Sequence, residues 1–289
     1  MQEHDRFDYS PIVQRPPRKL PNDARVGVWV IPNIEHFLFD RPSTSLTGIT
    51  TSLVPDILNY SWRDYGPRVG VWRMMEVLAK HGVKVTAALN SDVCARYPEL
   101  IKAGCEHGWE WMGHGKNNSS LFSKLPEDQE RALIREVIDT IHDATGVRPR
   151  GWLSPALSET HNTPDLLAEA GIEYTANWVN DEQPYQMKVK TGSLVSLPYA
   201  IELNDIPAFL DLKQSGEQFA TMIRDTFDVL YEEGASQPRF MAISLHPFLV
   251  GHPHRSKPFE RALEYIKQRG NVWFATGSEI LDWHNSTRG

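Results

Sequence analysis

Residues 108–118 read Gly-Trp-Glu-Trp-Met-Gly-His-Gly-Lys-Asn-Asn, an apolar run that stops at Gly113 and continues into a polar turn. This pattern predicts a buried strand that ends at a loop carrying His114. Glycine on each side of the histidine lets backbone or a ligand approach the imidazole closely. A hydrogen-bonded core histidine would fit the same stretch, so the function of His114 depends on what the rest of the chain places around it.

The same succession of strand and polar loop recurs along the chain, in alternation with amphipathic segments. Residues 25–32 and 239–245 are nearly continuous apolar runs, as in buried parallel strands. Residues 126–145 and 216–234 carry apolar side chains at helical spacing. Strands and helices alternate about seven times without a fixed-period repeat, which predicts an α/β protein with a parallel sheet, open or closed as a barrel.

Two boundaries follow from local composition. The first strand is expected to end at Pro32, and residues 40–65 are expected to form a long loop because they show no helical period. Residues 1–25, rich in Pro, Arg and Asp, are expected to form an extended arm over the chain's own domain or a neighbouring subunit. Residues 26–289 are expected to form a single domain, since one large α/β domain suits this length.

Composition narrows the range of partners. The net charge of −7 argues against nucleic acid or an anionic membrane as a partner, because both require a basic face. No apolar run approaches the ~20 residues of a membrane span, and the first residues have no apolar signal core. A cytoplasmic protein with a small-molecule substrate is therefore expected. Cys94 and Cys105 have no metal-type spacing and are interpreted as free packing residues.

Polar side chains follow six of the predicted strands at their carboxyl ends. In parallel α/β folds these ends meet at one edge and form the site. We therefore expect one polar pocket there. Its candidate members are Asn33, Glu35, His36, His114, Asn118, Trp152, Ser154, Asn180, Asp181, Asn204, Asp205 and His246.

The chemistry available in this set is general acid–base catalysis. Glu35 is expected to take a proton from water, His246 to return it to a leaving group, and His114 to orient the water or polarise a carbonyl. Asparagine and serine side chains can bind an amide-like substrate, and Trp152 can form a flat wall. Gly-x-Ser-x-Gly is absent and no cysteine lies at a strand end, so a covalent nucleophile is not expected. The expected substrate-binding residues are Asn33, His36, Asn118, Trp152, Ser154, Asp181 and Asn204.

A metal must also be considered. Glu35, His114 and His246 are ligand types that suit a hydrolytic zinc with an open position. However, a His-x-x-x-His pair is missing at His114, because residue 118 is asparagine, a poor zinc ligand. The expectation is an enzyme without a cofactor, with zinc or another divalent metal as the alternative.

Several short motifs together resemble a known family. The motifs are Asn33-x-Glu35, Gly66-x-Arg68-x-Gly70-Val71-Trp72-Arg73, Gly113-His114-Gly115, Thr145-Gly146-x-Arg148-Pro149-x-Gly151-Trp152, Asn180-Asp181-x-x-Pro184-Tyr185, Pro198-Tyr199, Asn204-Asp205, Phe227-Asp228-Val229-Leu230-Tyr231 and Leu245-His246-Pro247-x-Leu249-x-Gly251-x-Pro253-x-Arg255. As a set they resemble the polysaccharide deacetylase family, and within it the branch that includes the metal-independent allantoinases.

The resemblance implies a fold, an activity and an assembly. The fold would be a NodB-like deformed (β/α) barrel with about seven parallel strands, related to the TIM barrel. Metal-dependent members carry an Asp-Asp pair and His-x-x-x-His, where this chain has Glu35 and Asn118. The implied activity is hydrolysis of a non-peptide carbon–nitrogen bond in a small amide, cyclic imide or ureide. The resemblance also favours a homo-oligomer, with a tetramer as one form.

The chain departs from the allantoinase-like pattern at three places. After Glu35 the chain has His36-Phe37-Leu38-Phe39 in place of a Glu- and Gly-rich stretch. After Trp152 it has Ser154-Pro155-Ala156 in place of Thr-Gly-Arg, and Lys116-Asn117-Asn118 also differs from the pattern of that branch. The lost arginine would have been able to bind a ureide oxygen, so allantoin is only one candidate substrate. Two alternatives remain open: a metal-dependent deacetylase of an acetylated amino sugar, and a non-catalytic barrel that binds a small ligand.

Overall fold

Strand β1 (Val26–Ile34) lies at the centre of the computed structural model, which describes residues 4–41, 49–50 and 52–287. All nine of its residues are buried. It pairs in parallel with β8 from Val26 to Pro32, and with β9 and β2 on its other edge. Because both edges and both faces are covered, the strand can be apolar throughout.

The strand continues beyond Pro32, where the sequence predicted its end. Asn33 and Ile34 extend it by pairing with Ala88 and Leu89 of β2. Pro32 lies at the point where the pairing with β8 finishes, opposite Leu245. The extension matters because Glu35 is the first residue after the strand.

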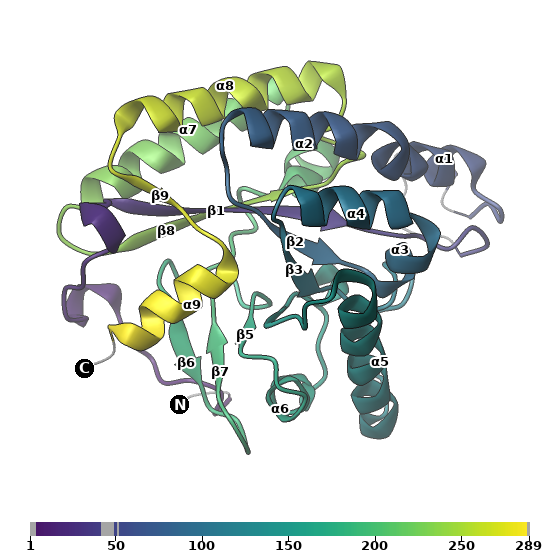
Figure 1. Cartoon of the computed structure of the whole chain (residues 1–289), viewed down its shortest axis with the longest axis horizontal. Coiled ribbons are helices and arrows are strands. Elements are labelled where there is room, and N and C mark those ends of the chain that lie inside the picture. Colours follow the sequence, from purple (N-terminus) through teal and green to yellow (C-terminus); the bar gives the residue numbers. More distant parts are fainter. Residues whose placement is uncertain (1–3, 42–48, 51, 288–289) are drawn as a thin grey trace.

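The sheet has the order β6-β7-β5-β4-β3-β2-β1-β8, with β9 beside the first part of β1. Only the β6–β7 pair is antiparallel among the described strands. Figure 1 shows the sheet curling with helices outside it, so the predicted deformed (β/α) barrel is confirmed, with nine described strands instead of about seven. The remaining strands are β2 (Thr86–Leu89), β3 (Glu110–Gly113), β4 (Gly151–Trp152), β5 (Tyr174–Thr175), β6 (Tyr185–Met187), β7 (Leu194–Ser196), β8 (Arg239–Leu245) and β9 (Val272–Phe274).

The sheet separates an outer core from an inner one. Most of the helices pack on the convex face of the sheet, as α2, α7 and α8 do in Figure 1. The inner face is filled by aromatic side chains such as Trp29, Tyr174 and Phe240, together with Trp283 of α9. The interior is thus packed and the barrel is not a pore. The helices are α1 (Ile57–Tyr65), α2 (Val71–Lys80), α3 (Ser91–Arg96), α4 (Pro98–Glu106), α5 (Glu127–Thr145), α6 (Thr163–Glu169), α7 (Gly216–Glu233), α8 (Pro253–Arg269) and α9 (Gly277–Ser286).

Helix α1 corrects the prediction that residues 40–65 form a loop; residues 42–48 and 51 of that segment lie outside the described part. Asp56 caps the helix by accepting a hydrogen bond of 3.0 Å from the backbone nitrogen of Asn59. Its buried side chains are Asn59 and Arg63, whereas Ile57 and Leu58 are exposed. A helix that buries its polar side chains has no apolar stripe, and for this reason its sequence does not resemble a helix.

The N-terminal arm lies on the chain's own domain. It is extended, apart from 3-10 turns at Ile12–Gln14 and Pro21–Asp23. The side chain of Arg15 pairs with Asp181 at 2.6 Å, and that of Arg6 with Asp165 at 3.0 Å. These partners are at most 18% exposed, so the pairs fix the arm more firmly than fully solvated pairs would.

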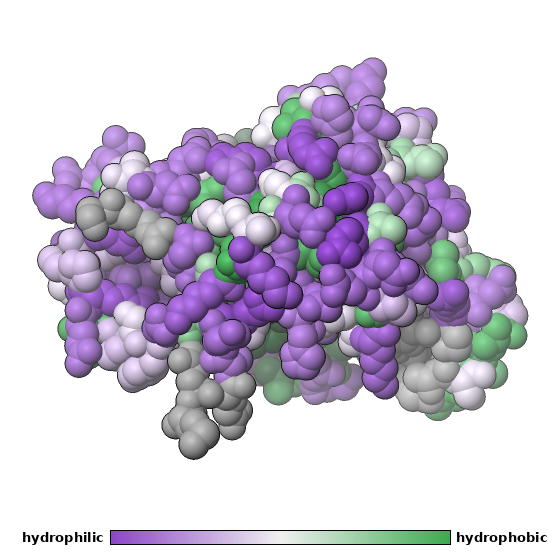
Figure 2. All heavy atoms as spheres, turned by 90° about the horizontal axis from the view of Figure 1, so that it is seen from below, coloured by the Kyte–Doolittle hydropathy of each residue, from purple (hydrophilic) through white to green (hydrophobic). Residues whose placement is uncertain are grey.

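The surface offers few apolar areas. The face in Figure 2 is largely hydrophilic, with hydrophobic residues gathered toward the edge where Figure 1 places α1. Exposed apolar side chains in that region are Ile49, Leu53, Val54, Ile57 and Leu58. Within the described ranges, none of the helices is both long and apolar enough to cross a membrane. The homo-oligomer and the cytoplasmic location stay predictions.

Candidate active site

The three predicted catalytic side chains meet at the carboxyl ends of the strands. Glu35 follows β1, His114 follows β3 and His246 follows β8, and all belong to the hydrogen-bonded block β3-β2-β1-β8. Oε1 of Glu35 lies 3.4 Å from Nε2 of His114 and 3.4 Å from Nε2 of His246. Each of the three side chains is at most 4% exposed. The structure thus forms a buried carboxylate–imidazole cluster.

His246 is oriented by Asp205, a predicted member of the polar pocket at the strand ends. Nδ1 of His246 lies 2.6 Å from Oδ1 of Asp205, and the backbone nitrogen of His246 donates to Oδ2 at 2.9 Å. Since a carboxylate only accepts, Nδ1 carries a proton and Nε2 is the nitrogen that faces Glu35. Burial lowers the pKa of His246, but the charges of Glu35 and Asp205 outweigh it and raise this pKa to about 9.

Glu35 is ionised in this environment. Burial raises the pKa of its carboxyl group, but the charge of His246 and the hydrogen bonds of His114 and His246 hold that pKa well below its usual range. The resting cluster therefore contains a Glu35 carboxylate and a His246 imidazolium at neutral pH. His246 thus has a proton to give, and Glu35 is in the form that accepts one.

His114 and Asn118 complete the surroundings of Oε1. Nδ1 of His114 lies 2.5 Å from the carbonyl oxygen of Leu153, which fixes Nε2 as the nitrogen that faces Glu35. The side-chain amide of Asn118 donates to the same Oε1. Its own oxygen accepts from Asn90 at 3.0 Å, which sets the orientation of the amide. Asn118 therefore acts as a hydrogen-bond donor to Glu35.

Oε2 of Glu35 contrasts with Oε1. It is buried, and no described residue forms a hydrogen bond with it. Two small cavities adjoin this carboxylate, each of about 10 Å³. That volume is close to the space a single water requires. A buried acceptor beside such a space is a feature that a catalytic role would explain.

Two predicted substrate-binding residues near the strand ends, Asn33 and Asn204, form hydrogen bonds with neighbouring polar side chains. Asn33 donates to Oγ of Ser244 at 2.8 Å and so ties the end of β1 to β8. Asn204 donates to the hydroxyl of Tyr199 at 3.1 Å, and that hydroxyl donates to the same Ser244. His36 is buried beside Glu35, and its ring lines one of the two cavities.

Trp152 of β4 is paired with Gly113 of β3, and both Trp152 and Ser154 are buried. The ring of Trp152 is fully buried, and a Cβ on Gly113 would lie 2.6 Å from it. Gly113 is thus required for this packing. Ser154 accepts hydrogen bonds from the indole of Trp152 and from Asn177, both at 3.0 Å. In this structure the indole offers no surface to a ligand, because the strand that carries His114 covers it.

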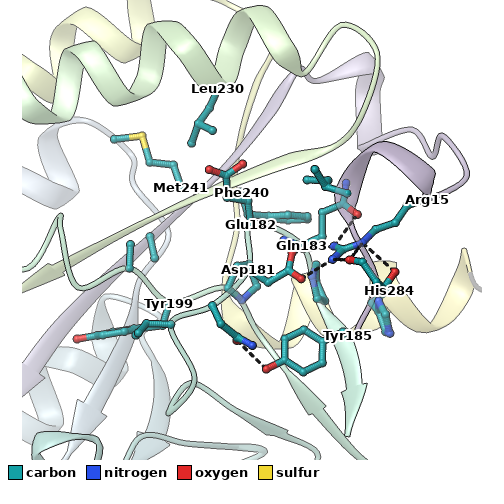
Figure 3. A pocket seen from close by; sticks show the side chains of 18 of the residues that line it. Arg15, Asp181, Glu182, Gln183, Tyr185, Tyr199, Leu230, Phe240, Met241 and His284 are labelled. Atoms are coloured by element: carbon teal, nitrogen blue, oxygen red, sulfur yellow. Dashed lines mark hydrogen bonds and ion pairs between the residues drawn. The ribbon is translucent and has the colours of Figure 1, made fainter. Parts of the chain in front are cut away.

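Asp181 lies at a different cavity, of about 1170 Å³, between the N-terminal arm and residues 179–185. Figure 3 shows Asp181 facing Arg15 of the arm, with ion-pair distances of 2.6 and 2.7 Å. The side-chain oxygen of the neighbouring Asn180 accepts a hydrogen bond of 2.8 Å from the hydroxyl of Tyr185. The structure therefore brings Asp181 to the arm and not to Glu35.

Two residues of the cluster's wall escaped the sequence analysis. Arg63 of α1 and Tyr97 line both small cavities with Glu35. Arg63 was hidden because its helix was taken for a loop. Tyr97 separates the short helices α3 and α4, where nothing in the sequence distinguishes it from a packing residue.

The fit of a metal can be tested on these side chains. The donor types suit zinc, but Oε1 of Glu35 lies between the two Nε2 atoms and already accepts from Asn118. Among described residues, ligand atoms all within 4.8 Å of one another occur in His81, Glu260 and Glu264, and not in the cluster around Glu35. His81 ends α2 and the two glutamates belong to α8. The arrangement around Glu35 therefore does not fit a metal as it stands.

A curled, mostly parallel sheet of this order matches the NodB-like deformed barrel, a fold whose deacetylase members hydrolyse carbon–nitrogen bonds other than peptide bonds. Residues 60–175 match the model of the family described as polysaccharide deacetylase. Over these residues the chain is similar to that family, as its motifs predict.

Relatives and solved structures agree with this assignment. A putative polysaccharide deacetylase of Schizosaccharomyces pombe is 29% identical over 247 residues, which cover 75% of this chain and 73% of the relative. A peptidoglycan deacetylase of Helicobacter pylori is 23% identical over 250 residues, covering 75% of this chain and 84% of the relative.

Two crystal structures resemble nearly the whole chain. A probable polysaccharide deacetylase from Pseudomonas aeruginosa PAO1 superposes with a TM-score of 0.88 at 28% identity, covering 96% of this chain and 98% of that one. The PuuE allantoinase superposes with a TM-score of 0.86 at 27% identity, covering 98% and 99%. The chain is thus similar both to a probable polysaccharide deacetylase and to an allantoinase.

Proposed function

We propose that this protein hydrolyses a carbon–nitrogen bond of a small amide, cyclic imide or ureide, with water activated by Glu35. The observation that supports this most is the asymmetry of the carboxylate. Oε1 accepts from the amide of Asn118 and lies 3.4 Å from Nε2 of each histidine, whereas Oε2 is buried and has no hydrogen-bond partner among the described residues. Oε2 is therefore the oxygen that can take a proton from water.

The steps balance with the groups present. Water beside Oε2 gives a proton to Glu35 as its oxygen attacks the carbonyl carbon of the scissile bond. To polarise the carbonyl oxygen, which carries negative charge in the tetrahedral intermediate, His114 must carry a proton on Nε2 in addition to the Nδ1 proton that it donates to the Leu153 carbonyl. His246 then donates its Nε2 proton to the leaving nitrogen as the carbon–nitrogen bond breaks. Transfer of the proton from Glu35 to His246 restores the enzyme, and the acid leaves together with the released N–H group, as two products from an acyclic amide or as one ring-opened product from a cyclic imide or ureide.

Burial supports a small substrate over a polymer. Glu35 is 4% exposed, and each adjoining cavity is about 10 Å³. A polysaccharide chain needs an open groove at the reacting group, whereas a small ligand can be largely enclosed. Similarity to the PuuE allantoinase makes allantoin one candidate in this class.

A metal-dependent N-deacetylase is the second candidate, and one observation favours it. Nδ1 of each imidazole is held by an acceptor, the Leu153 carbonyl for His114 and Asp205 for His246. Metal-binding histidines commonly have such outer partners, with the other nitrogen directed at the ion. Similarity to the peptidoglycan deacetylase agrees with this alternative.

Chelation separates the two candidates. If water is activated by Glu35 alone, protein dialysed against EDTA should keep its full rate on the substrate found in a panel of cyclic imides, ureides and N-acetyl amino sugars. The measurement is initial rate before and after chelation, with metal content determined on the same samples. Loss of activity that Zn²⁺ restores would instead establish the metal-dependent deacetylase.

The pH profile tests the role of Asp205. His246 must be protonated to act as the acid, so kcat/KM should fall as pH rises through about 9. Asp205→Asn removes a negative charge that stabilises the imidazolium, and we expect the alkaline limb to move to lower pH by about one unit or more. Rates from pH 6 to 10 measure the shift. Asp228→Asn, a partly exposed position on α7, serves as the control, and an unmoved limb in Asp205→Asn would contradict the assignment.

A further inference from the structure

Arg63 is a buried cation on the wall of the active site. Its side chain comes from α1, and the residue is 7% exposed. The guanidinium carbon lies 3.6 Å from the centre of the Phe37 ring and 5.1 Å from that of Phe248. Nε donates to Oδ1 of Asn59 at 3.5 Å. A guanidinium stacked on ring faces directs its N–H groups outward in its own plane, where they can meet acceptors.

Arg63 and Glu35 both line the two small cavities. Four residues line both of them: Glu35, Arg63, Pro67 and Tyr97. A molecule that displaces this wall to reach Glu35 therefore meets the guanidinium of Arg63 at the same time. Proline offers no donor, and the tyrosine hydroxyl carries no charge, so Arg63 is the group in this set best suited to bind an electron-rich oxygen.

The charge of Arg63 persists at neutral pH. Burial lowers its pKa to about 10, while the nearby Glu35 carboxylate opposes that change. In a dry site, a hydrogen bond from a charged donor is stronger than the same bond in water. An oxygen that reaches this guanidinium gains an interaction that water outside the protein does not match.

We propose that Arg63 is a specificity-determining residue, which donates hydrogen bonds to a second carbonyl of the substrate. This deepens the proposed function and rests on it. His114 serves the carbonyl that is attacked, so Arg63 serves the carbonyl on the other side of the nitrogen. Imides and ureides have that second carbonyl, whereas a simple acetamide, such as an N-acetyl amino sugar, does not.

A pair of matched rings tests the idea. Succinimide and 2-pyrrolidinone are five-membered rings of similar size, and only succinimide has the second carbonyl. Their dissociation constants are to be measured by ligand-observed NMR in the Glu35→Gln protein, so that turnover does not interfere. We expect succinimide to bind about tenfold more tightly or better, as a hydrogen bond from a charged donor predicts. In the double variant that carries both Glu35→Gln and Arg63→Gln, the dissociation constants of the two rings should become nearly equal.

Controls distinguish recognition from a structural role. Arg68→Gln, an exposed position next to the same helix, should keep the preference, and Arg63→Lys should keep part of it. Unfolding temperatures identify any variant whose fold has changed. A preference that survives Arg63→Gln, or protein with Arg63 that binds succinimide no better than 2-pyrrolidinone, would overturn the proposal. Rapid succinimide turnover by Glu35→Gln would instead refute the proposed mechanism. The ratio of the two dissociation constants would still test the role of Arg63.

Discussion

Glu35→Gln is expected to lower kcat about a thousandfold, because general-base catalysis typically contributes 10²–10⁴. Glutamine keeps the shape of the side chain but cannot take a proton at neutral pH. The substrate still meets Arg63 and His114, so KM should change much less than kcat. The measurement is steady-state kinetics on the identified substrate, with circular dichroism and the unfolding temperature showing that the variant is folded.

A matched control comes from Glu130 on α5. This glutamate is also fully buried, and it accepts a hydrogen bond of 2.6 Å from Thr160. It belongs to a helix and not to a loop at the strand ends. Glu130→Gln makes the same chemical change and should leave kcat within about twofold, whatever its effect on stability. If Glu35→Gln turned over substrate as fast as Glu130→Gln, the carboxylate would not be the base.

Gly70→Ala should be among the most destabilising single substitutions in the chain. A Cβ at Gly70 would lie 2.0 Å from the carbonyl oxygen of Pro247, the residue after His246. Backbone cannot yield as a flexible side chain does, so the start of α2 or the His246 loop must shift. We expect a loss of about 3 kcal/mol in the free energy of unfolding, at the upper end for overpacking. Urea denaturation measures it, and kcat should fall as well because His246 moves.

Gly108→Ala supplies the comparison. Gly108 has φ of +68°, and no atom lies within 4 Å of the Cβ position. Its substitution should cost about 1 kcal/mol, the cost of a left-handed backbone for alanine. Activity should be unchanged. Equal denaturation midpoints for Gly70→Ala and the unmodified protein would show that the contact with Pro247 is not as tight as described.

The cluster of Glu35, His114 and His246 was predictable because the carboxyl ends of parallel strands lie at one edge of the sheet. Once Glu35, His114 and His246 were each recognised as the residue that follows a strand, topology alone placed them on one edge. The family motifs gave the same answer from a different direction. Neither argument required knowledge of side-chain conformation.

The surroundings of the cluster were less predictable, and each case has a physical reason. Strand β4 has only two residues, so no alternation in the sequence could indicate that Trp152 faces the core. Asp181 follows a strand region as expected, but its partner Arg15 is 166 positions away in the arm. Arg63 belongs to a helix that buries polar side chains, which is the reverse of the usual helical pattern.

The pairing of β1 with β8 has a consequence for hydrogen exchange. Glu35 and His246 follow two strands paired residue by residue from Val26 to Pro32, with β2 or β9 on the far side of β1. Amides in this long ladder are expected to exchange mainly when the domain opens as a whole, whereas the short β6–β7 pair at the other end of the strand order can open by itself. Glu35 and His246 should therefore be anchored in a slowly exchanging part of the protein. Catalytic geometry should survive fluctuations that expose the edge of the sheet.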